Sequence, residues 1–419
     1  MRRYPLAHLV PCQGQNPNKG LGFQRKKANR AANMQQGKEE KHKTTRKVTF
    51  FDGKKIKDIL EMMTDFNTFL GLNDKLITVP EKATVEEALK EMKARNVTSL
   101  PIEGKDGKIK GLVSTLDIVV GVVFAPMYTR YNEEATSKLR LEDLKSITTN
   151  KALFESQVAN LVGIHEETRT LSEFWDDDDL SLLAHRMSMG VHRALIKPRD
   201  KTKKMRIVTQ TDFLNYIAQR IVTDPRIAKI MSQTIGKLGL VETTEVVTVK
   251  NTDRAVLGFR KLWMGGKWFD WSLSALPIVD AKGELVGNLS GSDMRNMTKD
   301  NLDDLLLSVE DFLWKMNGKS KMRTPVTVTL DTPFLQAVEK VMGNGIHRLW
   351  VTGTDEGEKK KVKGALSLTD IIYKFSTFDL SRHPIKEVTE RLPAKDFTVT
   401  TEYVVEYRTV PATSSSTGT

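Results

Sequence analysis

The sequence has almost no cysteine and no long hydrophobic run. Its 419 residues include one cysteine, Cys12, so no internal disulfide framework can form. No apolar stretch approaches the roughly 20 residues that a membrane-spanning helix needs, so we expect no membrane partner. The first ten residues carry Arg2 and Arg3 before a short apolar stretch that Pro5 interrupts, which is poor material for a secretory signal.

The motifs of common catalytic sites are missing as well. The sequence has no Walker-type loop, no protein-kinase signature set and no nucleophile-elbow pattern. Histidine occurs only seven times, and His165, His185 and His383 have no partners at metal-ligand spacing. We therefore expect a chain that is not an enzyme and that holds no metal and no cofactor.

Acidic residues are scarce only at the N-terminus. The chain carries a formal net charge of +12, yet residues 1–47 hold 12 Lys or Arg and only two acids, so the remainder is almost neutral. This favours a solubilising arm. A nuclear-localisation patch at 25–30, contact with nucleic acid and organelle targeting stay open. We expect a cytoplasmic or nuclear protein without a nucleic-acid partner.

Internal repeats are abundant. A short apolar strand, a turn and a second strand before an Asp recur four times, at 99–117, 192–212, 274–293 and 347–370. The closing aspartates are 95, 81 and 77 residues apart. Apolar helical patterns precede and follow each copy, and β-type runs come before three of the leading helices, at 76–79, 246–249 and 326–328. Each unit therefore reads strand–helix–strand–strand–helix, in the α+β or α/β class.

One unit of about 60 residues is marginal alone, which predicts two pairs, about 50–222 and 236–378. The organisation that we predict has six ranges: a basic disordered tail at 1–47, repeats at 48–130, 131–225, 236–300 and 301–380, and a C-terminal tail at 381–419. Residues 301–323 are expected to be helical, and the Ser/Thr-rich stretch from Pro411 disordered.

In each of the four copies, the strand that precedes the Asp ends in Ser or Thr, and the Asp follows three residues later. The four pairs are Ser114 and Asp117, Thr209 and Asp212, Ser290 and Asp293, and Ser367 and Asp370. One interpretation is helix capping, because these side chains accept bonds from unpaired N–H groups. The other is ligand binding: the carboxylate can accept bonds from both hydroxyls of a ribose, and a helix start suits phosphate. Recurrence in all four units favours binding.

The repeats resemble cystathionine-β-synthase (CBS) domains, and four in tandem resemble the gamma, or SNF4-type, regulatory subunit of AMP-activated and SNF1-related protein kinases. The resemblance covers about 50–378 and is carried by Leu273-Ser-Ala-Leu-Pro-Ile-Val-Asp280, Val191-His-Arg193, Ile346-His-Arg-Leu-Trp-Val351 and Ser367-Leu-Thr-Asp-Ile371. It implies two Bateman modules that form a disk, with AMP, ADP or ATP in the clefts between paired repeats.

The resemblance also implies roles for particular residues and partners. Phosphate would be bound by His192, Arg193, His347 and Arg348. Ribose would be bound by Asp293 and Asp370, with Asp117 as the equivalent in the first repeat, and the pattern itself adds Asp212 and the four Ser or Thr hydroxyls as candidates. A kinase catalytic subunit and a scaffold beta subunit would be the protein partners. Three positions depart from the family: this chain keeps Asp212, which animal members lack, and it has Thr98 and Glu242 where arginine is usual.

The sequence thus predicts an adenine-nucleotide-sensing regulatory subunit of a heterotrimeric Ser/Thr kinase. Two alternatives stay open: a stand-alone CBS sensor for another enzyme or transporter, and a non-catalytic scaffold with degenerate pockets. Other features favour plain structural interpretations. Asp176–Asp179 reads as a solvated helix start, 201–206 as a solvated turn, and Trp263, Trp268, Phe269 and Trp271 as core or interface.

Overall fold

The computed structural model describes residues 49–69, 76–128, 151–168, 171–220, 224–241, 246–264, 273–318, 322–358 and 360–377. The predictions for the basic tail, for Glu242, for three members of the aromatic cluster (Trp268, Phe269 and Trp271) and for the C-terminal tail lie outside these residues. So does the start of the second predicted repeat, at 131–150.

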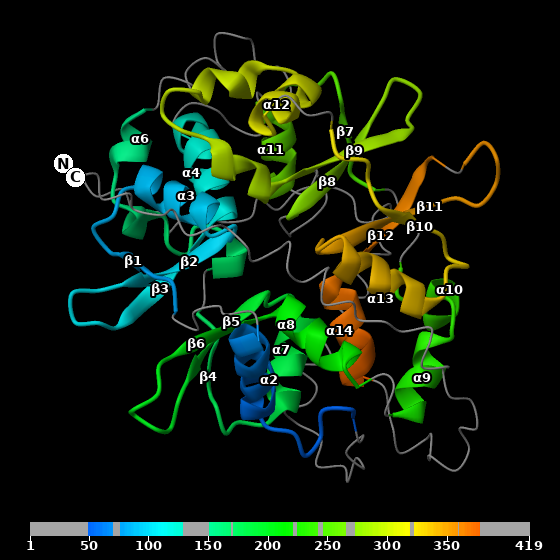
Figure 1. Cartoon of the computed structure of the whole chain (residues 1–419). Coiled ribbons are helices and arrows are strands. Elements are labelled where there is room, and N and C mark those ends of the chain that lie inside the picture. Colours follow the sequence, from blue (N-terminus) through cyan, green and yellow to red (C-terminus); the bar gives the residue numbers. More distant parts are fainter. Residues whose placement is uncertain are drawn as a thin grey trace, which may run out of the picture. The chain divides into compact units, whose positions relative to one another are not determined.

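The strands of the described residues form four three-stranded sheets, one per unit, shown in Figure 1. The first and second units comprise β1 (Val79–Pro80), α3 (Val85–Ala94), β2 (Ser99–Glu103), β3 (Ile109–Ser114) and α4 (Thr115–Tyr128), then β4 (Glu173–Trp175), α7 (Leu180–Ser188), β5 (Arg193–Lys197), β6 (Arg206–Thr209) and α8 (Gln210–Ala218). In both, the first strand pairs parallel to the second, and the second antiparallel to the third. The parallel pair needs a crossover, which the helix between its strands provides.

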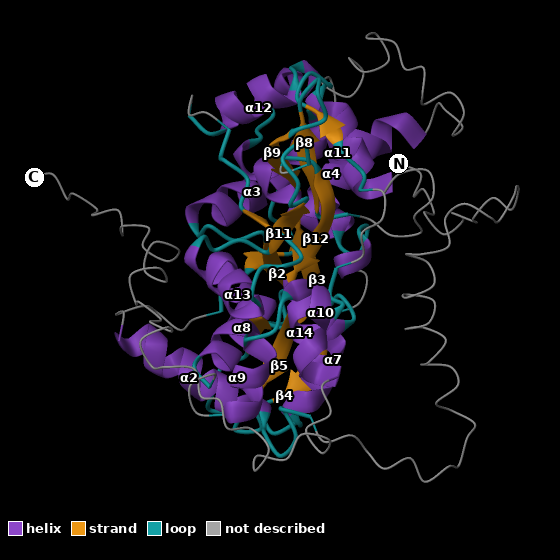
Figure 2. Cartoon of the chain, turned by 90° about the vertical axis from the view of Figure 1, so that its right-hand side faces the viewer, coloured by secondary structure: helices purple, strands orange, loops and turns teal. Residues whose placement is uncertain are grey.

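The third and fourth units repeat this order with the same pairing. They comprise β7 (Val249–Lys250), α11 (Ala255–Met264), β8 (Ala275–Val279), β9 (Leu285–Ser290) and the 3-10 helix η4 (Gly291–Asn296), then β10 (Thr327–Val328), α13 (Phe334–Gly343), β11 (Arg348–Thr352), β12 (Val362–Ser367) and α14 (Leu368–Thr377). The predicted class of repeated strand and helix units is confirmed. Figure 2 shows these strands running between the helices.

Local sequence explains where the helices begin. The Thr84 side chain accepts a bond from the Glu87 N–H, and the Glu87 carboxylate accepts one from the Thr84 N–H, which makes a capping box at the start of α3. The apolar positions that predicted this helix, from Val85 to Met92, are buried. The acidic run ends at the start of α7, where Asp179 holds the N-cap position without a capping bond from its side chain. Asp179 instead pairs with Lys55, and Asp177 pairs with Arg199, with both carboxylates half-exposed. It is the solvated helix start that was predicted.

The segments that precede or separate the units pair with helix starts of the units in a crossed order. They are α2 (Ile56–Phe69), α6 (Ala152–Glu155), η2 (Val158–Leu161), η3 (Glu166–Thr168), α9 (Pro225–Met231), α10 (Ile235–Leu238), η5 (Leu302–Leu306) and α12 (Val309–Met316). Reciprocal backbone bonds tie the start of α2 to that of α7 and the region before η2 to that of α3; they tie α10 likewise to α13, and α12 to α11. The same crossing occurs in each half, which supports the predicted pairing of units one with two and three with four.

Two hydrophobic cores join the units in the other direction. One core holds the helices of the first and third units, and the other those of the second and fourth together with residues 50–63. Two hydrogen bonds link the neighbouring sheets of the last two units, Trp350 Nε1 to Asn288 Oδ1 at 3.2 Å and Leu285 N to Lys360 O at 2.7 Å. Each unit therefore packs on one other through its helices, and the third and fourth units also contact each other through their sheets.

Several details differ from the expectation or refine it. Strand β4 completes the order predicted for each unit, but no β-type run located it in the sequence, because its three residues show no apolar alternation. The helical prediction for 301–323 is met by two short pieces, η5 and α12, rather than by one helix. The basic stretch 201–206 forms the turn between β5 and β6 and is largely exposed, and Trp263 is half-buried against the first core.

Candidate functional site: the helix starts and the two His-Arg pairs

The four aspartates all cap a helix, and each uses the same oxygen. Asp Oδ2 accepts from the N–H of the Ser or Thr three residues earlier at 2.7–3.0 Å, and from its hydroxyl at 2.6–3.0 Å. The capping interpretation of the motif is thus confirmed. It does not compete with a binding role, because capping needs only one of the two carboxylate oxygens.

The second oxygen of Asp117 is already occupied. Its Oδ1 accepts the His165 N–H at 2.8 Å and the Thr168 hydroxyl at 2.6 Å. Asp117 is fully buried. Burial raises the pKa of this carboxyl to about 6, although the bonds from Thr168, His165 and Ser114 act in the opposite direction.

Glu167 is the residue of this site that the sequence analysis missed. Its carboxylate accepts a 2.6 Å bond from Arg193 Nη1 and lies 3.0 Å from His192 Nδ1. Burial alone would raise the pKa of Glu167, but the charges of Arg193 and His192 outweigh burial and hold this pKa well below its usual range. No motif surrounds Glu167, so only the fold shows that it faces the predicted phosphate-binding pair.

The equivalent pair in the fourth unit has a different environment. Arg348 Nη2 donates a 2.6 Å bond to Ser274 Oγ, and among the described residues no carboxylate lies within ion-pair distance of it. Loss of hydration lowers the pKa of Arg348 to about 10, while the charges of Asp370 and Glu167 counteract this. Arg348 therefore stays protonated at neutral pH as a half-buried cation.

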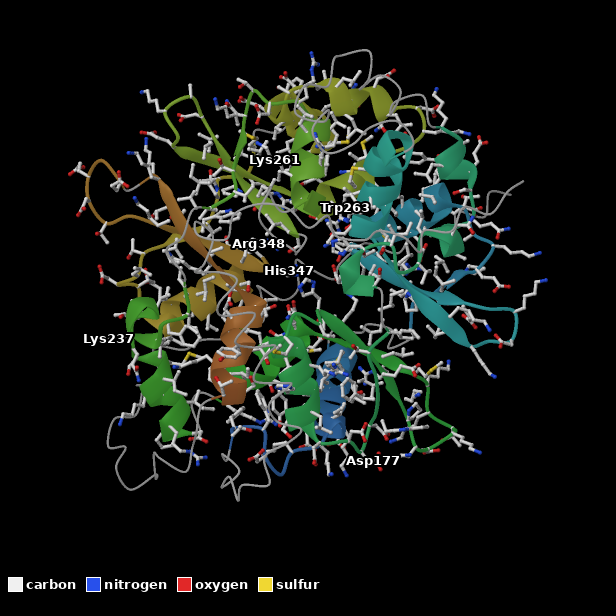
Figure 3. All side chains as sticks on the ribbon, turned by 180° about the vertical axis from the view of Figure 1, so that it is seen from behind. Asp177, Lys237, Lys261, Trp263, His347 and Arg348 are labelled. Carbon is white, nitrogen blue, oxygen red and sulfur yellow. The ribbon has the colours of Figure 1, made fainter. Side chains whose placement is uncertain are left out.

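His347 lies beside Arg348 where β11 begins, as Figure 3 shows. Loss of hydration and the positive charges of Arg348, His192 and Arg193 all lower the pKa of His347. This interaction shows that the two His-Arg pairs, 155 residues apart in the sequence, are brought near each other.

The helix starts meet in pairs. Gln210 of the second unit donates a 2.9 Å bond to Thr369 Oγ1 of the fourth. Gly291 of the third packs so tightly on the first that an added Cβ would lie 2.4 Å from Leu116 Cδ2. Asp212 and Asp293 are therefore next to unit boundaries. Burial raises the pKa of Asp293, and the described structure shows no hydrogen bond to its Oδ1.

The family model of the CBS domain matches two parts of the sequence, 70–123 and 319–377. This chain contains CBS domains. The two matched parts coincide with the first and fourth units, and the other two units have the same strand order and the same Asp-capped helix start.

The chain is similar over about 70% of its length to two differently named groups of proteins. It is 24% identical to the SNF1-related protein kinase regulatory subunit gamma-like PV42a of Arabidopsis thaliana, over 72% of this chain and 91% of that protein. It is 22% identical to protein SDS23 of Kluyveromyces lactis, over 71% of this chain but only 60% of that longer protein.

A solved structure has a similar fold. This protein of Methanocaldococcus jannaschii, described as an archaeal homologue of γ-AMPK, superposes with a TM-score of 0.52 at 17% identity and covers 72% of this chain and 97% of its own. In the described part of the chain, no helix is long and apolar enough to cross a membrane. No group of three His, Cys, Asp or Glu in that same part is placed to hold a metal ion.

Proposed function

We propose that this chain is a non-catalytic regulatory subunit that binds an adenine nucleotide, and that it acts within a protein kinase complex. A nucleotide needs an anion site and a hydroxyl site held at a fixed spacing. The second and fourth units offer both, as the His-Arg pair at the start of one strand and the Asp-capped helix start after the next. In the fourth unit, Arg348 and Ser367 are direct register partners on β11 and β12.

The observation that carries the proposal is the environment of Arg348. A half-buried, planar guanidinium whose one hydrogen bond among the described residues goes to a hydroxyl, Ser274 Oγ, keeps donors for an anion such as phosphate. His347 adds a further donor beside it, and Asp370 lies close enough to raise the pKa of Arg348. We assign phosphate to His347 and Arg348, and ribose to Asp370 with Ser367.

Titration calorimetry of the full chain with AMP, ADP and ATP tests this assignment. Arg348→Gln and Asp370→Ala should each weaken binding at least tenfold, since a hydrogen bond to a charged group contributes about 1.5–3 kcal/mol. Asp177→Ala is the matched control, because it removes a carboxylate that pairs with Arg199 on the surface and should not change binding. Unchanged affinity in both site variants would contradict the assignment.

The kinase role is supported by the similarity to PV42a, which extends over nearly all of that protein. The similarity to SDS23, whose name mentions no kinase, favours the second candidate, a CBS sensor that acts on another enzyme. Affinity purification of the chain from its source separates the two. Recovery of a kinase catalytic subunit with a beta scaffold supports the first, and recovery of a different enzyme supports the second.

A further inference from the structure

A turn of this chain contacts both halves of the first unit's candidate site at once. Thr168 and the His165 N–H bond Asp117 Oδ1, the oxygen that capping leaves available. Between them, the Glu167 carboxylate bonds Arg193 Nη1 at 2.6 Å and lies 3.0 Å from His192 Nδ1. Consecutive residues of η3 thus engage the proposed ribose-binding acceptor and the proposed phosphate-binding cations.

We propose that the turn 165–168 is a built-in occupant of the first-unit cleft, which stands in for a nucleotide and keeps nucleotides out. The Thr168 hydroxyl takes the place of a ribose hydroxyl, and the Glu167 carboxylate that of a phosphate. The inference rests on the proposed function, since that is what makes this cleft one of the nucleotide type. Nucleotide then binds at the fourth unit and not at the first.

Comparison of the two arginines shows what the turn changes. Both begin the central strand of their sheet, and both pair in register with the Ser or Thr of the motif, Arg193 with Thr209 and Arg348 with Ser367. Each also bonds a hydroxyl of the neighbouring unit, Thr98 at 3.1 Å or Ser274 at 2.6 Å. Among the described residues, Arg193 has a carboxylate partner, Glu167, and Arg348 has none.

Burial makes this occupant hard to displace. The side chains of Glu167 and Arg193 are only 8% and 13% exposed, so a phosphate that took Arg193 would leave a buried carboxylate without its cation. Breaking a buried pair in this way is strongly unfavourable. The turn is also part of the same chain, so it competes at a high effective concentration, without the entropy cost that a free ligand pays on binding.

Substituting the turn residues should open the cleft, and calorimetry then measures how many nucleotides each chain binds. Calorimetry with AMP and ATP on the full chain should show one added equivalent in the Glu167→Ala/Thr168→Ala variant relative to wild type. Adding Asp117→Ala to that variant should remove the gained equivalent. Glu173→Ala is the matched control, because it removes an exposed carboxylate of the second unit, the unit of Arg193, that pairs with Lys197. Its stoichiometry should equal that of wild type.

A second measurement does not depend on nucleotide. Glu167→Ala leaves Arg193 without its carboxylate, so added acetate or inorganic phosphate should raise the melting temperature of this variant by several degrees more than that of wild type or Glu173→Ala. Glu167→Gln serves in both assays if the alanine variants do not fold. A folded variant with neither an added equivalent nor anion rescue overturns the proposal. Anion rescue without nucleotide binding by any variant overturns the proposed function instead and leaves the occupancy of the cleft intact.

Discussion

At the scale of single residues, Asp117 should make stability depend on pH in an unusual direction. Its folded pKa of about 6 exceeds the ordinary 3.8, so between these values the folded state holds a proton that the unfolded state has released. The contribution of Asp117 to stability is therefore greatest below pH 4 and is lost as pH rises through 6. The loss is on the order of 2–3 kcal/mol, at about 1.4 kcal/mol per pKa unit.

Urea denaturation of wild type and Asp117→Asn at pH 4.5 and pH 7 measures this effect. As pH falls from 7 to 4.5, the free energy of unfolding of wild type should increase relative to that of the variant, because asparagine does not titrate. Asp280→Asn, in the turn after β8, serves as the control for loss of a carboxylate that accepts bonds only from its own turn. An equal pH dependence in wild type and Asp117→Asn would show that burial does not dominate at Asp117.

The same scale shows why the candidate site was only partly predictable. The aspartates and the His-Arg pairs recur at fixed places in a repeat, so the sequence alone reveals them. Glu167 occurs once, outside the repeats, and its partners Asp117 and Arg193 are 50 and 26 residues away along the chain. A contact of this kind depends on how a linker crosses the units, which no local pattern encodes.

At the scale of helices and strands, local signals succeeded where the chemistry itself is local. A capping box is made by residues three apart, and the starts of α3 and α8 follow their sequence patterns. Strand β4 has no such local signal. Glu173–Trp175 is too short to show alternation, and its extended conformation is set by pairing with β5. The crossed pairing of α2, η2, α10 and α12 was not predicted for a related reason: each bonds a helix start that is distant in sequence.

At the scale of the whole folded part of the chain, the marginal size of one repeat predicted that the units pair. It did not predict the two hydrophobic cores that the two halves share. Apolar periodicity identifies which face of a helix is buried and leaves its partner unspecified. In the structure that partner belongs to the other half of the chain: the first unit packs on the third, and the second on the fourth. Neither half completes a core by itself.

This arrangement predicts that the first half cannot remain a monomer alone. A chain of residues 48–223 would expose the faces that α11 and α14 cover, and a second copy can cover them because its units repeat the missing topology. Chromatography with light scattering should therefore show a dimer. Leu116→Asp in this half-chain should abolish the dimer, since Leu116 packs against Gly291 of the third unit in the full chain. A folded monomer of the unsubstituted half would show that each pair of units is stable without the shared cores.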